Sequence, residues 1–340
     1  MAPVLPRLAD LGADLLHVSR CQQAVVLLRP VVLIGAYAAA ARAGWWHLAL
    51  VLLVAVFPAM VAAIHDLLHR SLGLGPRANR WWLSVLGILV LQSGHAIQAT
   101  HAAHHRRFPA ADDPEAYVSR MSIPRAILEG PVYPVRLWAW ARCQPTSPRR
   151  RILGETAGHV VLGVGCLVAI PISPIPFVYA AAMCLACSLF PAVSVNLLHR
   201  EGAPDELAGT RTVHGVVLPL VTLGSGYHLE HHLYPRVPSP HYGRLARRLR
   251  PVLQPALQAA LQATMRPPAT TIGRPAAPGG TGPAGPRPRR RAGATTRSGG
   301  DAASLTGSVP ASPARMMAAG RRQRAGQPPQ RAERPGPMPT

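Results

Sequence analysis

The sequence contains no lysine, although its formal net charge is +22 at pH 7. Arginine therefore carries all of the fixed positive charge, and only 14 acidic residues oppose it. Charged residues make up 15% of the 340 residues, whereas 49% of the chain is hydrophobic. A soluble globular domain has roughly 25% charged residues. The composition is therefore unlike that of an ordinary soluble protein and is typical of a membrane protein.

Cysteine is rare as well, and five cysteines do not form the framework of a disulfide-stabilised secreted domain. Cys184 and Cys187 share a C-x-x-C spacing that also occurs in redox and zinc motifs. Inside the apolar run "AAAMCLACSLF" the spacing favours two small residues that pack on one helix face. The N-terminal stretch "MAPVLPRLADLGADLL" has acidic residues and no basic region before an apolar core, so we expect no cleaved signal peptide.

The basic charge is concentrated at the C-terminal end. Residues 266–340 carry 13 arginines against 2 acids, which is half of the net charge. This segment is rich in Pro, Gly, Ala and Ser and has no apolar period, so it cannot bury enough surface to offset its chain entropy. We predict a disordered tail. It has no aromatic residues for stacking bases, so we expect no specific nucleic-acid partner, and contact with an anionic cytoplasmic leaflet is the alternative.

Four apolar stretches have about the 17 to 25 residues needed to cross a hydrocarbon core. They are residues 24–41, 47–64, 152–170 and 172–198. Short links join the members of each pair, and Trp45 and Trp46 lie where an interfacial aromatic belt is expected. We predict an all-α integral membrane protein with two helical hairpins. Residues 1–23 form an N-terminal segment before this membrane domain, which spans 24–265.

Arginine also predicts the orientation of these hairpins. The segment between them, residues 65–151, holds many arginines, and the links within the hairpins hold almost none. The positive-inside rule then places this segment, both termini and the C-terminal third in the cytoplasm of a multi-pass inner-membrane protein. A fifth apolar run, residues 81–98, is expected to be re-entrant or interfacial, because it separates two groups of histidines that belong together.

Histidine is the residue type whose pattern carries chemistry. The three groups are "HDLLH", "HAAHH" and "HLEHH", and a further histidine follows the fourth span in "NLLHR". Histidines at i, i+3 and i+4 lie on one side of a helical turn, so each group presents its rings to one place. Crowded imidazoles repel one another when protonated and need partners when neutral and buried, and a metal ion removes both problems.

One ion takes four to six ligands, so nine imidazoles suit two ions. An imidazole-rich site with open positions favours iron, which activates dioxygen. Zinc is the second choice, because structural zinc sites close at four ligands. A histidine-lined metal transporter would instead place its polar residues at the bilayer midplane, whereas these groups lie at helix ends and in the predicted cytoplasmic segments.

The order H-x-x-x-H, H-x-x-H-H, H-x-x-H-H resembles the histidine boxes of the membrane fatty acid desaturase family. The stretch "YHLEHHLYPRVP" is also similar to that family's third box and the proline turn after it. The resemblance covers roughly residues 24–250. It implies a non-haem di-iron centre at the cytoplasmic membrane face, with a helical cap, which uses O₂ and two electrons to remove hydrogens from an acyl chain.

By this resemblance nine histidines are expected to bind iron: His65, His69, His101, His104, His105, His199, His228, His231 and His232. Asn196 is expected to contribute through a water. Asp66 and Glu230 lie inside the boxes and are expected either to fix an imidazole tautomer or to be ordinary polar residues at a helix end. The acidic stretch "FPAADDPE" after the second box could orient that box, dock an electron donor or form a plain acidic turn, and we favour the turn.

The first box and the intact third box resemble acyl-lipid desaturases more than members with H-x-x-x-x-H or Q-x-x-H-H. We therefore expect an O₂-dependent di-iron desaturase that introduces a C=C bond into a lipid acyl chain. A hydroxylase or carotenoid ketolase would use the same boxes and remains the alternative. No fused cytochrome segment or ferredoxin cysteine set is visible, so we expect electrons from a separate ferredoxin, flavoprotein reductase or cytochrome.

Overall fold

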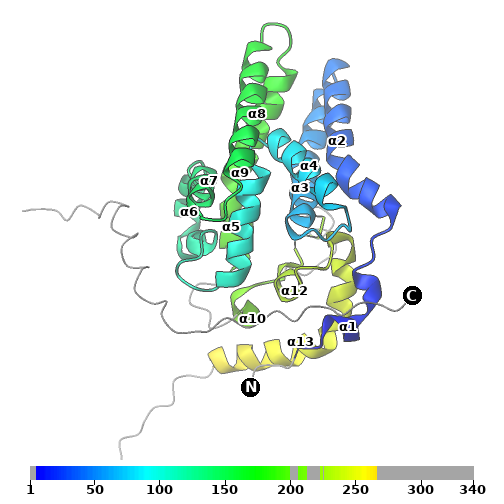
Figure 1. Cartoon of the computed structure of the whole chain (residues 1–340), viewed down its shortest axis with the longest axis vertical. Coiled ribbons are helices and arrows are strands. Elements are labelled where there is room, and N and C mark those ends of the chain that lie inside the picture. The colour runs from blue at the N-terminus through cyan, green and yellow to red at the C-terminus, as the bar shows by residue number, and fades with distance from the viewer. Residues whose placement is uncertain (1–4, 200–205, 213–222, 225, 266–340) are drawn as a thin grey trace, which may run out of the picture. The chain divides into compact units, whose positions relative to one another are not determined.

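The structure is a computed structural model that describes residues 5–199, 206–212, 223–224 and 226–265. Regular structure in these residues is helical, apart from one isolated bridge between His199 and Thr210 (Figure 1). The expected all-α class is therefore confirmed. The tail predicted for residues 266–340 lies outside the described residues.

Within the described residues, four helices are long and apolar enough to cross a membrane, as the sequence predicts. They are α2 (Arg20–Arg42), α3 (Trp46–His69), α8 (Arg149–Val168) and α9 (Ile175–Phe190), which continues through the π-helix η3 (Pro191–Asn196). The third helix thus begins before its predicted range of 152–170 and the fourth begins after residue 172. Figure 1 shows the α2–α3 and α8–α9 links at the same end of the described part of the chain.

Local sequence explains where α2 begins and where α3 ends. Ser19 caps α2, because its hydroxyl accepts from the Gln22 backbone N–H while the Gln22 side chain accepts from the Ser19 N–H. The α3 helix continues to His69 and stops at Arg70, which adopts the left-handed conformation (φ 54°). That extra length beyond the predicted residue 64 keeps His65 and His69 on one helix face.

The apolar run 81–98 is divided between two helices rather than forming one. These are α4 (Pro76–Leu89) and α5 (Gly94–Arg107), and their axes meet at 106°. Such a bend is the geometry of a broken span or a re-entrant loop. Two glycines allow it: a Cβ on Gly87 would lie 2.7 Å from the Gly94 nitrogen, and one on Gly94 would lie 2.4 Å from the Leu83 oxygen. The backbones can approach this closely only without side chains.

A buried carboxylate holds the bend against α8. Glu155 accepts hydrogen bonds from the hydroxyls of Ser84 at 2.5 Å and Ser93 at 2.6 Å, and from the backbone N–H of His95 at 3.1 Å. The His95 ring contacts the same carboxylate, with 2.5 Å between Nδ1 and Oε1. Glu155 and His95 are each 3% exposed, so α4, the start of α5 and α8 share one polar contact inside apolar surroundings.

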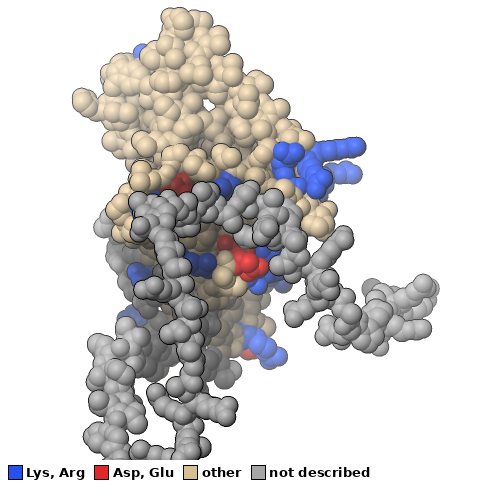
Figure 2. Space-filling view, turned by 90° about the vertical axis from the view of Figure 1, so that its left-hand side faces the viewer, with Lys and Arg blue, Asp and Glu red and all other residues tan. Residues whose placement is uncertain are grey.

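The main apolar core lies between α2, α3, α4 and α9. On the outer faces of the long helices, by contrast, large apolar side chains are exposed, among them Val51 (67%), Val54 (74%) and Val161 (71%). Figure 2 shows that the end formed by the α2–α3 and α8–α9 links is almost free of charged residues on the face in view. An apolar outer surface on apolar helices is the arrangement expected in contact with lipid.

Further helices lie beside the other end of the four apolar helices. The helices α1 (Leu8–Leu11), α12 (His228–Leu233) and α13 (Tyr242–Met265) enclose a separate cluster of buried leucines and tyrosines. Three further elements, η2 (Ala116–Arg120), α6 (Ile123–Glu129) and α7 (Tyr133–Cys143), pack near η3 and α9. Figure 1 shows α1, α12 and α13 at the end away from the long-helix links.

Candidate metal centre

All nine predicted histidines lie together and form two groups. In site one His65, His69, His101 and His231 place one ring nitrogen each within 4.8 Å of the others, and in site two His104, His199, His228 and His232 do the same. His105 adjoins site one, because its Nε2 atom lies 3.2 Å from Nε2 of His101 and 2.9 Å from Nε2 of His231. The structure thus offers five imidazoles to one site and four to the other.

Helix periodicity divides the second and third boxes between the two sites. On α5, the i and i+4 residues His101 and His105 face site one, whereas His104 faces site two. On α12 the assignment is reversed: His228 and His232 face site two, and His231 faces site one. Around a helix, position i+4 lies 40° to one side of position i, and position i+3 lies to the opposite side of it. The histidines of one turn can therefore face two neighbouring centres.

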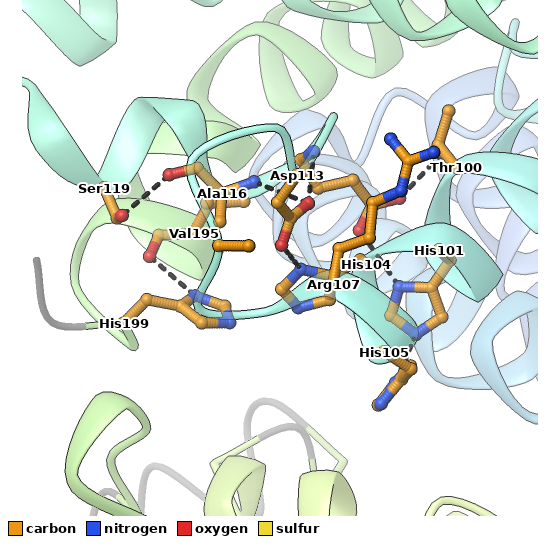
Figure 3. A network of polar contacts seen from close by, with 12 residues as sticks. Thr100, His101, His104, His105, Arg107, Asp113, Ala116, Ser119, Val195 and His199 are labelled. Carbon is orange, nitrogen blue, oxygen red and sulfur yellow. Dashed lines mark hydrogen bonds and ion pairs between the residues drawn. The ribbon is translucent and has the colours of Figure 1, made fainter. Parts of the chain in front are cut away.

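Acceptors behind the rings fix the tautomer of three histidines (Figure 3). His104 donates from Nδ1 to Asp113 at 2.6 Å, and His101 donates from Nδ1 to Glu115 at 3.0 Å. His199 donates from Nδ1 to the Val195 carbonyl at 2.9 Å. A carboxylate or carbonyl can only accept, so the proton lies on Nδ1 and the lone pair of each Nε2 points into the site.

A tyrosine stands behind the rings of site one. The Tyr242 hydroxyl lies 2.9 Å from Nδ1 of His231 and 3.5 Å from Nδ1 of His65. Tyr242 is buried at the start of α13, and burial raises its pKa well above the usual value, so the hydroxyl keeps its proton at neutral pH. It therefore links the third box to the first through neutral hydrogen-bonding groups.

The donor set fits a metal ion in each site. Neighbouring Nε2 atoms lie 3.0 Å apart between His69 and His101, and 3.0 Å apart between His199 and His228. Two nitrogens at right angles on one ion, at about 2.0–2.1 Å from it, are about 3 Å apart, so these spacings fit a shared ion. Burial lowers the pKa of His199 to about 4, so this ring is neutral at pH 7 and its Nε2 lone pair can bind a metal.

The remaining rings outside the long helices agree with a neutral, metal-ready site. Burial first, and then the neighbouring imidazoles, lower the pKa of His228, His231 and His232 well below the usual value. Burial acts to raise the pKa of Asp113 and Glu115, but the contacts from His104 and His101 outweigh it and leave both carboxyls more acidic than usual. Neutral imidazoles backed by carboxylates are the ligand arrangement that divalent metals favour.

Three polar residues named from the sequence have other contacts. Asp66 accepts from Ser71 and from the backbone and hydroxyl of Ser239, so its contacts hold the loop after the third box. Asn196 donates from its amide to the carbonyls of Val118 and Met121. Glu230 accepts a hydrogen bond from the Thr212 hydroxyl.

The acidic stretch after the second box is more than a plain turn, contrary to the interpretation we favoured. Asp113 and Glu115 are buried behind two imidazoles, and their position in "ADDPE", within 14 residues of the box, was the available signal. Tyr242 and the His95–Glu155 contact had no such signal, because their partners lie far away along the chain.

An apolar cavity adjoins both histidine sites. Its lining includes the imidazoles of His65, His101, His228 and His231 together with the apolar side chains of Phe57, Val61, Val90, Cys187 and Phe190. The apolar side chains come from α3, from α9 and from the break between α4 and α5. A narrow apolar space that ends on polar groups suits a hydrocarbon chain with one reacting segment.

Fold and site together define a helical, membrane-type protein with two groups of imidazoles that could each hold a metal ion. Residues 43–262 match the family described as fatty acid desaturase, which is more than half of the chain and includes all nine histidines. The chain belongs to this family, and the resemblance seen in the histidine boxes is confirmed. No curated protein matches the chain. Membership supports a membrane oxidoreductase that carries out a desaturase- or hydroxylase-type oxidation of fatty acyl chains.

Proposed function

We propose that this protein is an O₂-dependent acyl-lipid desaturase with two iron ions held by the nine histidines. The reaction takes a CH₂–CH₂ pair, O₂, two electrons and two protons to a CH=CH pair and two waters. The observation that carries the proposal is the apolar cavity that ends on both imidazole groups. A hydrocarbon chain that lies in this cavity has only C–H bonds to present to the metal sites.

The proposed ligands follow the two groups in the structure. His65, His69, His101, His105 and His231 hold one ion, and the other four histidines hold the second. Bound iron would supply the activation of dioxygen that breaks an unactivated C–H bond. Asp113 and Glu115 keep two rings of the second box in the tautomer that binding requires, and the Tyr242 hydroxyl holds the ring of His231 in position.

Desaturation, not oxygen insertion, is the outcome we favour, on the resemblance of the first and third boxes to acyl-lipid desaturases. The same site can insert oxygen if the oxidant faces a single C–H bond, which would give a hydroxylase or ketolase. We further propose that the boxes face the cytoplasm and that a separate ferredoxin, flavoprotein reductase or cytochrome supplies the electrons. The arginine-rich segments around the boxes support this orientation.

Mass spectrometry of total lipids from cells that express the full chain tests the reaction. We expect a new acyl species that lacks two hydrogens in cells with the intact protein. The species should be absent with the double variant His231→Ala, His232→Ala and present with His47→Ala, which changes an exposed histidine at the other end of α3. A product heavier by one oxygen would assign the site to hydroxylation or ketolation instead.

Metal analysis of the purified full chain tests the centre independently of any substrate. We expect close to two irons for each chain, with the content reduced by the same double variant and unchanged by His47→Ala. Iron should also dissociate with chelator under conditions in which the helices remain folded, which circular dichroism would show. Two zinc ions, or no bound metal in a folded protein, would contradict the di-iron proposal.

A further inference from the structure

An arginine without a partner lies inside the first apolar helix. Arg29 is nine residues along α2 from Arg20, which places it about 13 Å from the start of the helix. Among the described residues it makes no hydrogen bond and no ion pair, and its Nε atom is buried. A charged side chain in a membrane segment costs free energy unless a counter-charge meets it, so an unpaired arginine there marks a binding site.

Asp66 is a carboxylate whose charge acts on Arg29, but other groups hold its oxygens. Asp66 accepts from the Ser239 backbone at 2.8 Å, from the Ser239 hydroxyl at 2.6 Å and from the Ser71 hydroxyl at 3.1 Å. No ion pair within 4.0 Å joins it to Arg29. The five N–H donors of the guanidinium are therefore available to an anion that comes from outside the chain.

Arg29 lines a pocket whose chemistry is amphiphilic. Gln22 and Ser239 contribute polar groups to its wall, and Val25, Val26 and Leu223 contribute apolar ones. None of the described residues that line it is acidic. A pocket with one cation, two neutral polar side chains and an apolar wall is complementary to an oxyanion that is attached to a hydrocarbon.

This pocket adjoins the cavity that leads to the metal sites. Gly224 and Ser239 line both of them, the pocket on the Arg29 side and the cavity on the side of His228 and His231. The Arg29 pocket and the cavity at the histidines are therefore neighbours, with these two residues at their shared boundary. The hydrogen bonds from Ser239 to Asp66 hold that shared wall in place.

We propose that Arg29 binds the oxyanion head, a phosphate or a carboxylate, of the amphiphile whose chain enters the cavity. That the bound hydrocarbon chain is the substrate rests on the proposed function, but the binding itself needs neither metal nor turnover. It assigns the pocket to an anionic lipid or a fatty acid and distinguishes this chain from an enzyme that selects its substrate by a neutral head.

Cys21 provides a readout of occupancy, because it is exposed and lines the same pocket. Full-length protein in dodecyl maltoside is treated with N-ethylmaleimide, and modification of Cys21 is followed by peptide mass spectrometry. The exposed Cys143 serves as the internal reference. The probes are dodecyl phosphate and dodecanoate. The controls are dodecanol, which has the hydrocarbon chain without the anion, and inorganic phosphate, which is an anion without the hydrocarbon chain.

We expect at least one anionic probe to slow modification of Cys21 about tenfold when present at about ten times its Kd, while the rate at Cys143 does not change. Stronger protection by dodecyl phosphate identifies a phospholipid head, and stronger protection by dodecanoate identifies a free fatty acid. Arg29→Gln should abolish protection, and Arg29→Lys should retain part of it. Arg42→Gln, an exposed arginine at the other end of α2, should leave protection intact.

Three results would overturn the proposal. They are equal protection in the folded Arg29→Gln variant, equal protection by dodecanol or by inorganic phosphate alone, and no protection of the intact protein by either anionic probe. Because iron-free protein serves as well as loaded protein, a lack of desaturase activity would not affect this result. Conversely, a negative result for Arg29 would leave the lipid and metal tests of the proposed function standing.

Discussion

At the scale of single residues, the orientation of each imidazole depends on the group behind it. Asp113 and Glu115 leave their neighbours protonated on Nδ1, which turns the Nε2 lone pairs of two box-two histidines toward different sites. The two carboxylates are buried and belong to the same short segment. Replacing either carboxylate should therefore weaken metal binding more than it destabilises the helices.

Asp113→Asn should weaken metal binding by about 10- to 100-fold, because an amide can donate to Nδ1 and so favours the wrong tautomer. Chelator competition on the full chain measures the affinity. Asp112→Asn is the matched control, since Asp112 is exposed and pairs only weakly with Arg107 at 3.5 Å. Equal affinity in the two variants would show that Asp113 does not orient His104.

The metal-free protein should lose stability as the pH falls from about 6.5 toward 4. His199 has a pKa of about 4 when folded and about 6.5 when unfolded, so in this window the unfolded chain binds a proton that the folded site does not. Stability is then fully present above pH 6.5 and decreases below it, by up to about 3 kcal/mol for this group.

Thermal unfolding of the apoprotein across this pH range measures the effect, which His199→Gln should reduce. Bound metal should move the loss to lower pH, since protons and metal compete for the same nitrogens. A melting temperature that does not change between pH 6.5 and 4.5 would contradict the assignment of neutral, buried imidazoles.

At the scale of elements, the bend between α4 and α5 decides where the second box lies. Glu155 on α8 receives hydrogen bonds from Ser84 on α4 and from Ser93 and His95 at the start of α5. The carboxylate also lies at the N-terminus of α5, where a negative charge is favourable. The helix that carries His101, His104 and His105 is thus fixed from the side opposite the metal sites.

Glu155→Leu should destabilise the protein by about 3–5 kcal/mol, because it leaves buried hydroxyls and an imidazole without their partner. Denaturation in detergent measures the loss, and Arg151→Gln, at an exposed position of the same helix, is the control. Glu155→Gln should cost less, since the amide oxygen still accepts. If Glu155→Leu is as stable as the Arg151 variant, the polar contact does not hold the bend.

At the scale of the whole molecule, the proposed substrate, metal sites and electron donor all depend on how the chain lies in the membrane. The long helices expose apolar side chains along their length, and the histidine groups lie at one end of them. If the arginine pattern sets the orientation, the histidine end, the N-terminal segment and Cys143 all face the cytoplasm.

Thiol labelling in membrane vesicles tests this orientation. A membrane-impermeant maleimide should modify Cys143 in inverted inner-membrane vesicles and leave it unmodified in right-side-out vesicles, since Cys143 is exposed at the end of α7. The variant Cys143→Ser identifies the signal. Labelling from the outside would place the histidine sites on the other face and exclude a cytoplasmic electron donor.

The sequence by itself determined the helical class, the four long apolar helices and the nine histidines, because these depend on local patterns. Hydropathy over about 20 residues and spacings of three and four along a helix need no tertiary information. Only the tertiary structure decided which histidine serves which site, since the reversed assignment of boxes two and three depends on how α5 and α12 face each other. The same is true of Tyr242 behind His231, of Glu155 at the bend and of the pocket at Arg29. Each of these joins residues distant in the chain, and the packing that brings them together is fixed by the whole core and not by any one segment.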